Sequence, residues 1–155
     1  EVIGWGQVED NLTIPPADPT RLETSARAVE KALASAGITA ADLGTVECHD
    51  CFTISGLLSV EAIGLAKQGE GTDYILAGNT SRTGTLPFNT SGGLIGWGHP
   101  TGGTGVRQAV TLWEQLTGKA GKCQIPLSPG KPYALSVNMG GNDKTVVAIV
   151  YKRAA

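Results

Sequence analysis

Segments of strand character and segments of helical character alternate along almost the whole chain, and this alternation restricts the fold more than any other feature. Apolar residues typical of strands occupy residues 1–8, 43–48 and 133–138. Between them, apolar residues recur at helical spacing over 22–36 and 104–117. Strand–helix–strand repeats make right-handed crossovers and bury a sheet beneath helices. The order therefore predicts an α/β fold.

Residues typical of helix ends and turns indicate where these segments begin and end, and so the order of the elements. Thr20-x-x-Glu23 resembles a capping box at the start of the first helix, and Gly37 suits its end. A further helix is expected over 53–66, apolar nearly all round and so covered on several sides. With a short strand at 88–91 and a final hairpin turned by "MGGND", the order is β-α-β-α-β-α-β-β. We expect a mixed five-stranded sheet with helices on both faces.

The composition narrows the class of protein. The 155 residues suit a single domain, 1–155, and the net charge of -2 comes without any basic patch interleaved with aromatic residues, which argues against nucleic-acid binding. No apolar run approaches the roughly 20 residues of a membrane span. Three cysteines cannot all pair with one another, so we expect free thiols in a reducing compartment.

Residues 47–53, "ECHDCFT", concentrate cysteine, histidine and carboxylate side chains. A C-x-x-C pair at a strand–helix junction is typical of redox dithiols, but strand alternation turns Cys48 towards one face and Glu47 and His49 towards the other. We therefore expect Cys48 to be a buried apolar side chain. No second ligand pair accompanies the cluster, so we predict no zinc or other metal site, and the histidine spacing does not fit haem attachment.

His49 and Cys51 admit two interpretations. They lie where a helix is expected to begin, and the helix dipole favours a thiolate there, so they suit acid–base work. Alternatively the segment is a satisfied polar junction, with Asp50 capping the following helix. The cluster alone does not decide between these two interpretations.

The second histidine lies in the glycine-dense stretch "GGLIGWGHPTGGTG", where His99 stands between Gly98 and Pro100. Glycines let the backbone approach a ligand closely, and such loops often carry functional residues. "HDCF", "GHPTGGTG" and "MGG" each follow an expected strand. Ligands in α/β sheets bind at the carboxyl ends of strands, so we expect these three loops to converge there.

Taken together, these motifs resemble the thiolase family. "GGLIGWGHPTGGTG" is similar to the GHP loop of thiolases, "ECHDCF" to the loop that replaces NEAF in the sterol-carrier-protein type, and "NMGG" to the C-x-G loop. The motifs occur in the same order and spacing over Val2 to Lys152. The resemblance is to the C-terminal half of the fold, in enzymes of the acetyl-CoA acetyltransferase and lipid-transfer type.

The resemblance implies roles for particular residues. His99 corresponds to the histidine that activates the nucleophilic cysteine and helps bind the thioester oxygen, and His49 replaces the asparagine that holds a water in that oxyanion hole. Cys51 takes the place of the acid/base cysteine. The resemblance also implies a group of oxyanion-hole or substrate-binding residues, namely Asn138 at the C-x-G cysteine, Gly140 at its glycine, and Gly98 in the GHP loop.

The implied activity is thiolytic cleavage, or Claisen condensation, of 3-oxoacyl-CoA, with coenzyme A as co-substrate and no tightly bound cofactor. The nucleophilic cysteine belongs to the other half of thiolases, and Cys123 lies in a polar connection unlike that loop. We therefore expect the chain to be one half of an active site, inactive alone and dimeric as part of the longer enzyme. The implied location is cytoplasmic in a bacterium and peroxisomal in a eukaryote.

Two alternatives stay open. A thiolase-fold aldolase or lyase acting on steroid side-chain CoA esters would use His49 or His99 and need no cysteine nucleophile. A non-catalytic module that binds acyl-CoA or lipid would keep the fold without the chemistry.

Overall fold

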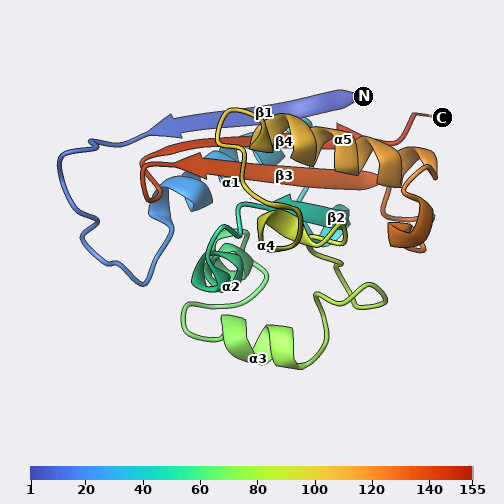
Figure 1. Cartoon of the computed structure of the whole chain (residues 1–155), viewed down its shortest axis with the longest axis horizontal. Helices are drawn as coiled ribbons and strands as arrows, with labels where there is room; N and C mark the ends of the chain where they lie inside the picture. Colours follow the sequence, from blue (N-terminus) through green and yellow to red (C-terminus); the bar gives the residue numbers. More distant parts are fainter. Residues whose placement is uncertain (155) are drawn as a thin grey trace.

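The computed structural model describes residues 1–154 and contains one mixed sheet with strand order β1-β4-β3-β2 (Figure 1). The β1 strand pairs antiparallel with β4, which pairs antiparallel with β3, whereas β2 runs parallel to β3. The β2 and β3 strands consequently end at the same edge of the sheet. The four strands are β1 (Val2–Glu9), β2 (Leu43–Cys48), β3 (Tyr133–Gly140) and β4 (Thr145–Lys152).

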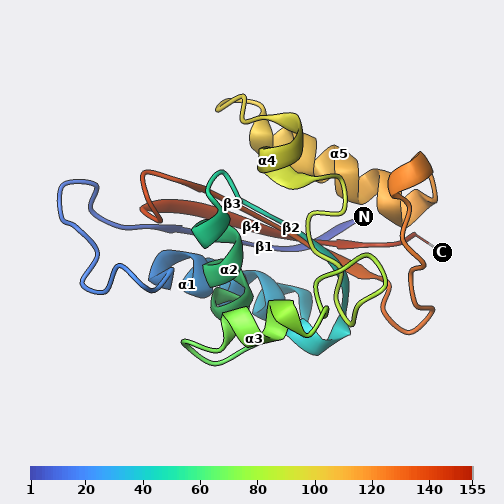
Figure 2. The ribbon, with the colours of Figure 1, turned by 60° about the horizontal axis from the view of Figure 1, so that its bottom comes forward.

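Helices cover both faces of the sheet, as the sequence predicts. Figure 2 shows α1, α2 and α3 on one side of the sheet and α4 and α5 on the other. Within residues 1–154, no helix is long and apolar enough to cross a membrane. The helices are α1 (Glu23–Ala36), α2 (Thr53–Ala62), α3 (Gly71–Leu76), α4 (Gly93–Trp97) and α5 (Thr104–Thr117), with 3₁₀ turns at Ala40–Asp42 and Gly121–Cys123.

The predicted fifth strand, at 88–91, is wrong: the sheet within residues 1–154 has four strands. Phe88 forms a single parallel bridge with Val46, and the next residue, Asn89, has φ 45°, which ends the extended backbone. The Asn89 side chain continues the pairing in place of backbone. Its Oδ1 accepts from the Cys48 amide at 2.7 Å, and its Nδ2 donates to the Cys48 carbonyl at 3.3 Å.

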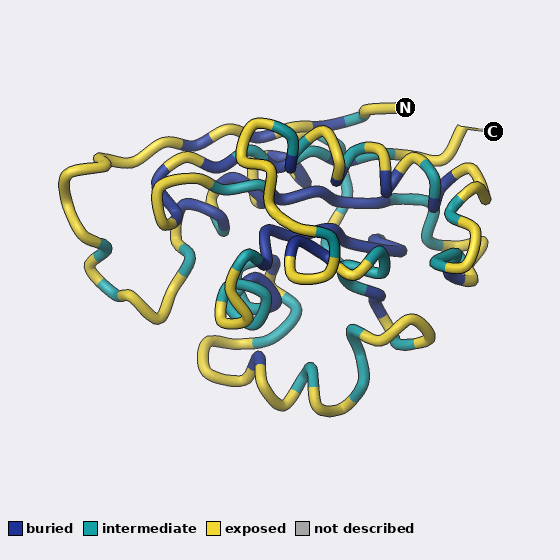
Figure 3. Tube along the Cα trace, in the orientation of Figure 1, coloured by how far each residue is buried: buried dark blue, intermediate teal, exposed yellow. Residues whose placement is uncertain are grey.

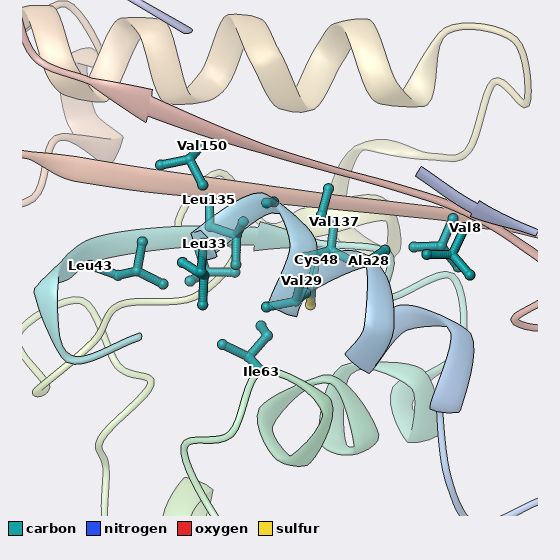
Figure 4. Packing of buried hydrophobic residues seen from close by; sticks show 14 of the residues in the cluster. Val8, Ala28, Val29, Leu33, Leu43, Cys48, Ile63, Leu135, Val137 and Val150 are labelled. Atoms are coloured by element: carbon teal, nitrogen blue, oxygen red, sulfur yellow. The ribbon is translucent and has the colours of Figure 1, made fainter. Parts of the chain in front are cut away.

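The main core lies between the sheet and α1, and Ile63, which directly follows α2, packs against it (Figure 4). The β1 strand contributes two glycines to this contact. A Cβ on Gly6 would lie 2.3 Å from the Ala28 carbonyl oxygen, and one on Gly4 would lie 2.6 Å from that of Ala32. The glycines therefore let α1 approach β1 more closely than side chains would allow. The buried apolar residues of this core include Val8, Val29, Leu33, Leu43, Val46, Leu135, Val137 and Val150.

The first helix ends as predicted but begins differently. Gly37 caps its C-terminus in the left-handed conformation, at φ 68°. The predicted capping box is wrong, because α1 begins at Glu23 and Thr20 instead donates to Asp18. The first turn is satisfied from the β3–β4 hairpin: Asp143 accepts from the amides of Thr24 and Ser25, both at 2.9 Å.

The two apolar helices that flank the predicted functional loops are more exposed than their sequences suggest (Figure 3). The expected apolar face of α5 points outward, with Val106 67% and Trp113 51% exposed. The side of α5 towards the sheet is mostly polar instead. The expectation that α2 is covered on several sides is also wrong, since Ile54 at its start is largely exposed. The buried residues of α5 are Thr104, Gln108, Thr111, Leu112, Gln115 and Leu116.

Candidate active site

His49 lies directly after β2, at the carboxyl edge of the sheet, and is buried with 4% of its surface exposed. Its Nδ1 lies 2.7 Å from the Asn138 Oδ1 on the neighbouring strand β3. Because an amide oxygen accepts hydrogen bonds, Nδ1 carries the proton and donates it. Gly105 of α5 makes room for this pair, since a Cβ there would lie 3.1 Å from the Asn138 Nδ2.

His99 comes from the loop between α4 and α5 and is exposed. Its Nδ1 lies 2.6 Å from the Thr104 hydroxyl oxygen, and that hydroxyl donates its own proton to the Pro100 carbonyl at 3.2 Å. With the threonine proton committed, Nδ1 of His99 is the donor in this contact as well. The loop thereby closes on the first residue of α5.

The two imidazoles meet. Their ring centroids are 4.7 Å apart and their planes are nearly perpendicular, at 89°. In the neutral form each ring has its Nδ1 proton engaged, which leaves the lone pair of Nε2 free to accept a proton. The site therefore holds two adjacent, oriented bases at the end of the sheet.

Burial sets the protonation of His49. Removal from solvent lowers the pKa of His49, an effect that the hydrogen bond with Asn138 opposes and the neighbouring His99 reinforces. His49 thus stays neutral around pH 7, with its Nε2 as an acceptor. Glu47 lies on the same face of β2 and is fully buried, and burial raises its pKa to about 7.

The two cysteines of the cluster are in different environments. Cys48 is buried in the core beneath β2, as predicted, and burial raises the pKa of its thiol to about 12. Cys51 is half-buried, and all three cysteines are free. Cys48 and Cys51 therefore do not form a disulfide, and within residues 1–154 no group of three or more metal-ligating side chains gathers.

The expectation that Asp50 caps the helix following it, α2, is wrong. The structure has Phe52, not Asp50, at the N-cap of α2. Asp50 instead accepts a hydrogen bond from the Leu94 amide at 2.7 Å, in the first turn of α4. It is therefore a cap for the helix that precedes His99.

Of the residues expected to act together, the structure joins His49, His99 and Asn138. Gly98 caps α4 with φ 97°, a backbone conformation that suits glycine, and places His99 directly after the helix. Gly140 ends β3 and is exposed. Cys51 follows His49 by two residues, without a hydrogen bond to either histidine among the described residues.

The residues that orient His99 were not apparent from the sequence. Thr104 holds the ring of His99 by a hydrogen bond. The only hint of this contact in the sequence is that a hydroxyl side chain follows the histidine by five residues. Strand alternation predicted that Glu47 lies on the same face as His49. Its hydrogen bond with Ser91, in the segment before α4, was not apparent from the sequence.

The structure is therefore an α/β domain with two adjacent imidazoles at the carboxyl edge of a mixed sheet. The chain belongs to the thiolase C-terminal domain-like family, whose model matches residues 6–153. It is 39% identical over 136 residues to the acetyl-CoA acetyltransferase of Methanothermobacter thermautotrophicus, covering 88% of this chain and 35% of that protein. It is 39% identical over 127 residues to human sterol carrier protein 2, covering 82% of this chain and 23% of that protein.

A solved structure has the same fold. The Ltp2-ChsH2(DUF35) aldolase matches with a TM-score of 0.77 and 22% identity, over 96% of this chain and 38% of that one. At this identity the likeness concerns the fold alone. The chain thus spans about a third or less of the curated relatives named above.

Proposed function

We propose that this chain supplies the histidine half of a thiolase-type active site, for thiolytic cleavage or Claisen condensation of 3-oxoacyl-CoA. The observation that carries the proposal is the pair of imidazoles, 4.7 Å apart, each with its Nδ1 held and its Nε2 free. Family membership and the 39% identity to an acetyl-CoA acetyltransferase support the choice of acyl-CoA as substrate and coenzyme A as co-substrate.

In the proposed cleavage, Nε2 of His99 takes the proton of a cysteine thiol supplied by the rest of the enzyme. The thiolate adds to the 3-oxo carbon, and the imidazolium N–H donates a hydrogen bond to the thioester oxygen, where negative charge develops as the C2–C3 bond breaks. Breaking the C2–C3 bond leaves an acetyl-CoA enolate, which takes a proton from Cys51. Coenzyme A then gives its thiol proton to the Cys51 thiolate and displaces the nucleophilic cysteine from the acyl group, which leaves as a shortened acyl-CoA. This step restores both the Cys51 thiol and the thiolate of the nucleophilic cysteine.

His49, Asn138 and the neighbouring glycines have supporting roles in this scheme. Neutral His49 offers Nε2 as an acceptor, which suits a bound water that donates one proton to it and the other to the thioester oxygen. We assign the amide of Gly140 to the second oxyanion hole. Gly98 contributes by its conformation, because it brings His99 to the site.

The exposed apolar stripe of α5 is the proposed contact with the missing half. Val106, Val110 and Trp113 follow one another at i, i+4 and i+7, and Trp5 on β1 is also exposed. Exposed apolar patches of this kind mark interaction sites. This chain matches 35% of the acetyltransferase relative, and the remainder of a protein of that length is large enough to provide such a partner. We expect the complete enzyme to be a dimer.

The test uses the full-length protein that carries this chain, with 3-oxoacyl-CoA and coenzyme A. His99→Ala should nearly abolish thiolysis, whereas Cys51→Ala should slow turnover while an acyl-enzyme still forms, detectable by mass spectrometry. Cys123→Ala is the matched control, since Cys123 is also half-buried but lies in the 3₁₀ turn Gly121–Cys123, which follows α5. Normal turnover of Cys51→Ala would remove Cys51 from the mechanism.

The aldolase alternative makes a different prediction for the same experiment. The histidine pair needs no cysteine in this chain to abstract a proton from a β-hydroxyacyl substrate, and the fold is shared with an aldolase. Cleavage of such a substrate without any acyl-enzyme would favour it. Binding of acyl-CoA with no reaction of either kind would favour a carrier module.

A further inference from the structure

The short helix α4 carries His99 to the site, yet it is only five residues long and only its first two residues, Gly93 and Leu94, are buried. A helix of this length is not stable by its own hydrogen bonds. Its position must therefore come from contacts with the rest of the domain. Those contacts lead to the strand that presents His49.

At the N-terminal end of α4, the contact is with Asp50. Its Oδ1 accepts from the Leu94 amide at 2.7 Å, and the carboxyl group is buried. Gly93 lies so close that a Cβ there would come within 2.2 Å of the Asp50 Oδ2. The carboxylate thus packs directly on the first residue of the helix.

At the C-terminal end, the contact is with Glu47 through Ser91. The Trp97 indole N–H donates to the Ser91 hydroxyl oxygen at 3.1 Å, and this hydroxyl donates to Glu47 Oε2 at 3.2 Å. The guanidinium carbon of Arg107, on α5, lies over the Trp97 ring, 5.3 Å from its centre. Trp97 is two residues before His99.

We propose that Glu47 and Asp50 are positioning residues that attach both ends of α4 to the end of β2 and so hold His99 against His49. Neither carboxyl group contacts either imidazole by a hydrogen bond within the described residues. His49 lies between them in the sequence, so the segment that presents one histidine also fixes the helix that presents the other. The catalytic meaning of this arrangement rests on the proposed function.

The charges around Glu47 are compatible with this role. Its burial raises its pKa, as does the negative charge of Asp50, whereas the bonds with Ser91 and the charge of Arg107 lower it. The carboxyl group keeps an oxygen for the Ser91 hydroxyl in either protonation state. A glutamine at the same position would keep it as well.

The experiment compares conservative with truncating substitutions in the full-length protein labelled with ¹⁵N-histidine. The ring resonances of His49 and His99 are assigned from the variants His49→Gln and His99→Gln. We expect Glu47→Gln and Asp50→Asn to keep the wild-type ring resonances, because each retains the accepting oxygen. Glu47→Ala, Asp50→Ala and Ser91→Ala should shift both sets, and kcat should fall about 100-fold, the loss that a misplacement near 1 Å produces.

The matched control is Asp143→Ala, which removes a buried carboxylate that caps α1 instead of α4. It should lower stability without moving the histidine resonances. If Glu47→Ala does not fold, Ser91→Ala tests the same connection with a smaller change. Unchanged resonances in folded Ser91→Ala and Asp50→Ala would overturn the positioning role.

The resonances also separate this inference from the function. Shifted resonances in variants of a protein whose wild type does not cleave 3-oxoacyl-CoA would uphold the positioning role and refute the proposed activity. Unchanged resonances in an active thiolase would do the reverse.

Discussion

The burial of Glu47 predicts a specific dependence of stability on pH. The carboxyl group has an ordinary pKa of 4.5, and burial in the folded chain raises it to about 7. Between these values the folded chain binds more protons at Glu47 than the unfolded chain does. The free energy of unfolding therefore falls as pH rises through this window.

The magnitude follows from the two pKa values. At 1.36 kcal/mol per pH unit, the difference between 4.5 and about 7 corresponds to about 3 kcal/mol. Glu47→Gln has no proton to lose and so removes this dependence. The contribution of Glu47 is fully present below pH 4.5 and fully lost above pH 7, so the variant should gain about 3 kcal/mol on the wild type over that range.

The assay is urea unfolding of both proteins from pH 4 to pH 8, followed by far-ultraviolet circular dichroism. The quantity to plot is the difference in free energy of unfolding between variant and wild type, because contributions from other titrating groups such as Asp143 cancel there. A constant offset would reflect the altered hydrogen bond to Ser91. A difference that does not change with pH would refute the argument that burial holds this carboxyl group near neutrality.

Three other substitutions or treatments test the packing and the thiols. Gly6→Ala should cost about 3 kcal/mol in urea unfolding, since its Cβ would overlap the Ala28 carbonyl 2.3 Å away. Asp143→Ala should cost about 2 kcal/mol in the same assay through loss of the α1 cap, and equal stability would show that solvent replaces it. With iodoacetamide at neutral pH, Cys48 should react about a thousandfold more slowly than an ordinary thiol, because burial raises its pKa to about 12; peptide mapping should find Cys51 and Cys123 alkylated before Cys48.

Much of the fold was predictable because its signals are local. Strand alternation located β2 and oriented Cys48 and His49, and Gly37 marked the end of α1. The start of α1 was not predictable in this way. Its cap is Asp143, more than 100 residues further along the chain, and a nearby capping motif gave the wrong answer.

The prediction of a fifth strand was wrong because it, too, relied on local composition. The segment at 88–91 has strand composition, but Asn89 adopts a positive φ and offers its side-chain amide to Cys48. The convergence of the three loops was predictable from topology, and the contacts of His49 with Asn138 and His99 confirm it. The contact between His99 and Thr104 could not be predicted in this way, because it depends on the conformation of the loop that joins them.

The inverted polarity of α5 follows from the site itself. Apolar spacing identified a stripe on this helix, and a sequence pattern alone favours turning that stripe towards the sheet. At this position, however, the sheet presents polar groups, including Glu47 and Asn138. A helix that covers them needs polar side chains: Gln108 donates to the Val137 carbonyl at 3.3 Å.

This orientation of α5 lowers the stability of the chain on its own. The Gln108 Oε1 and Thr111 Oγ1 are buried without a hydrogen-bond partner among the described residues, and such groups typically cost about 1–3 kcal/mol each. The apolar stripe meanwhile stays in solvent, where it contributes nothing to the core. Both features make sense together if the polar face serves the site and the apolar face packs against the rest of the enzyme, so the same helix would join the two halves of the active site.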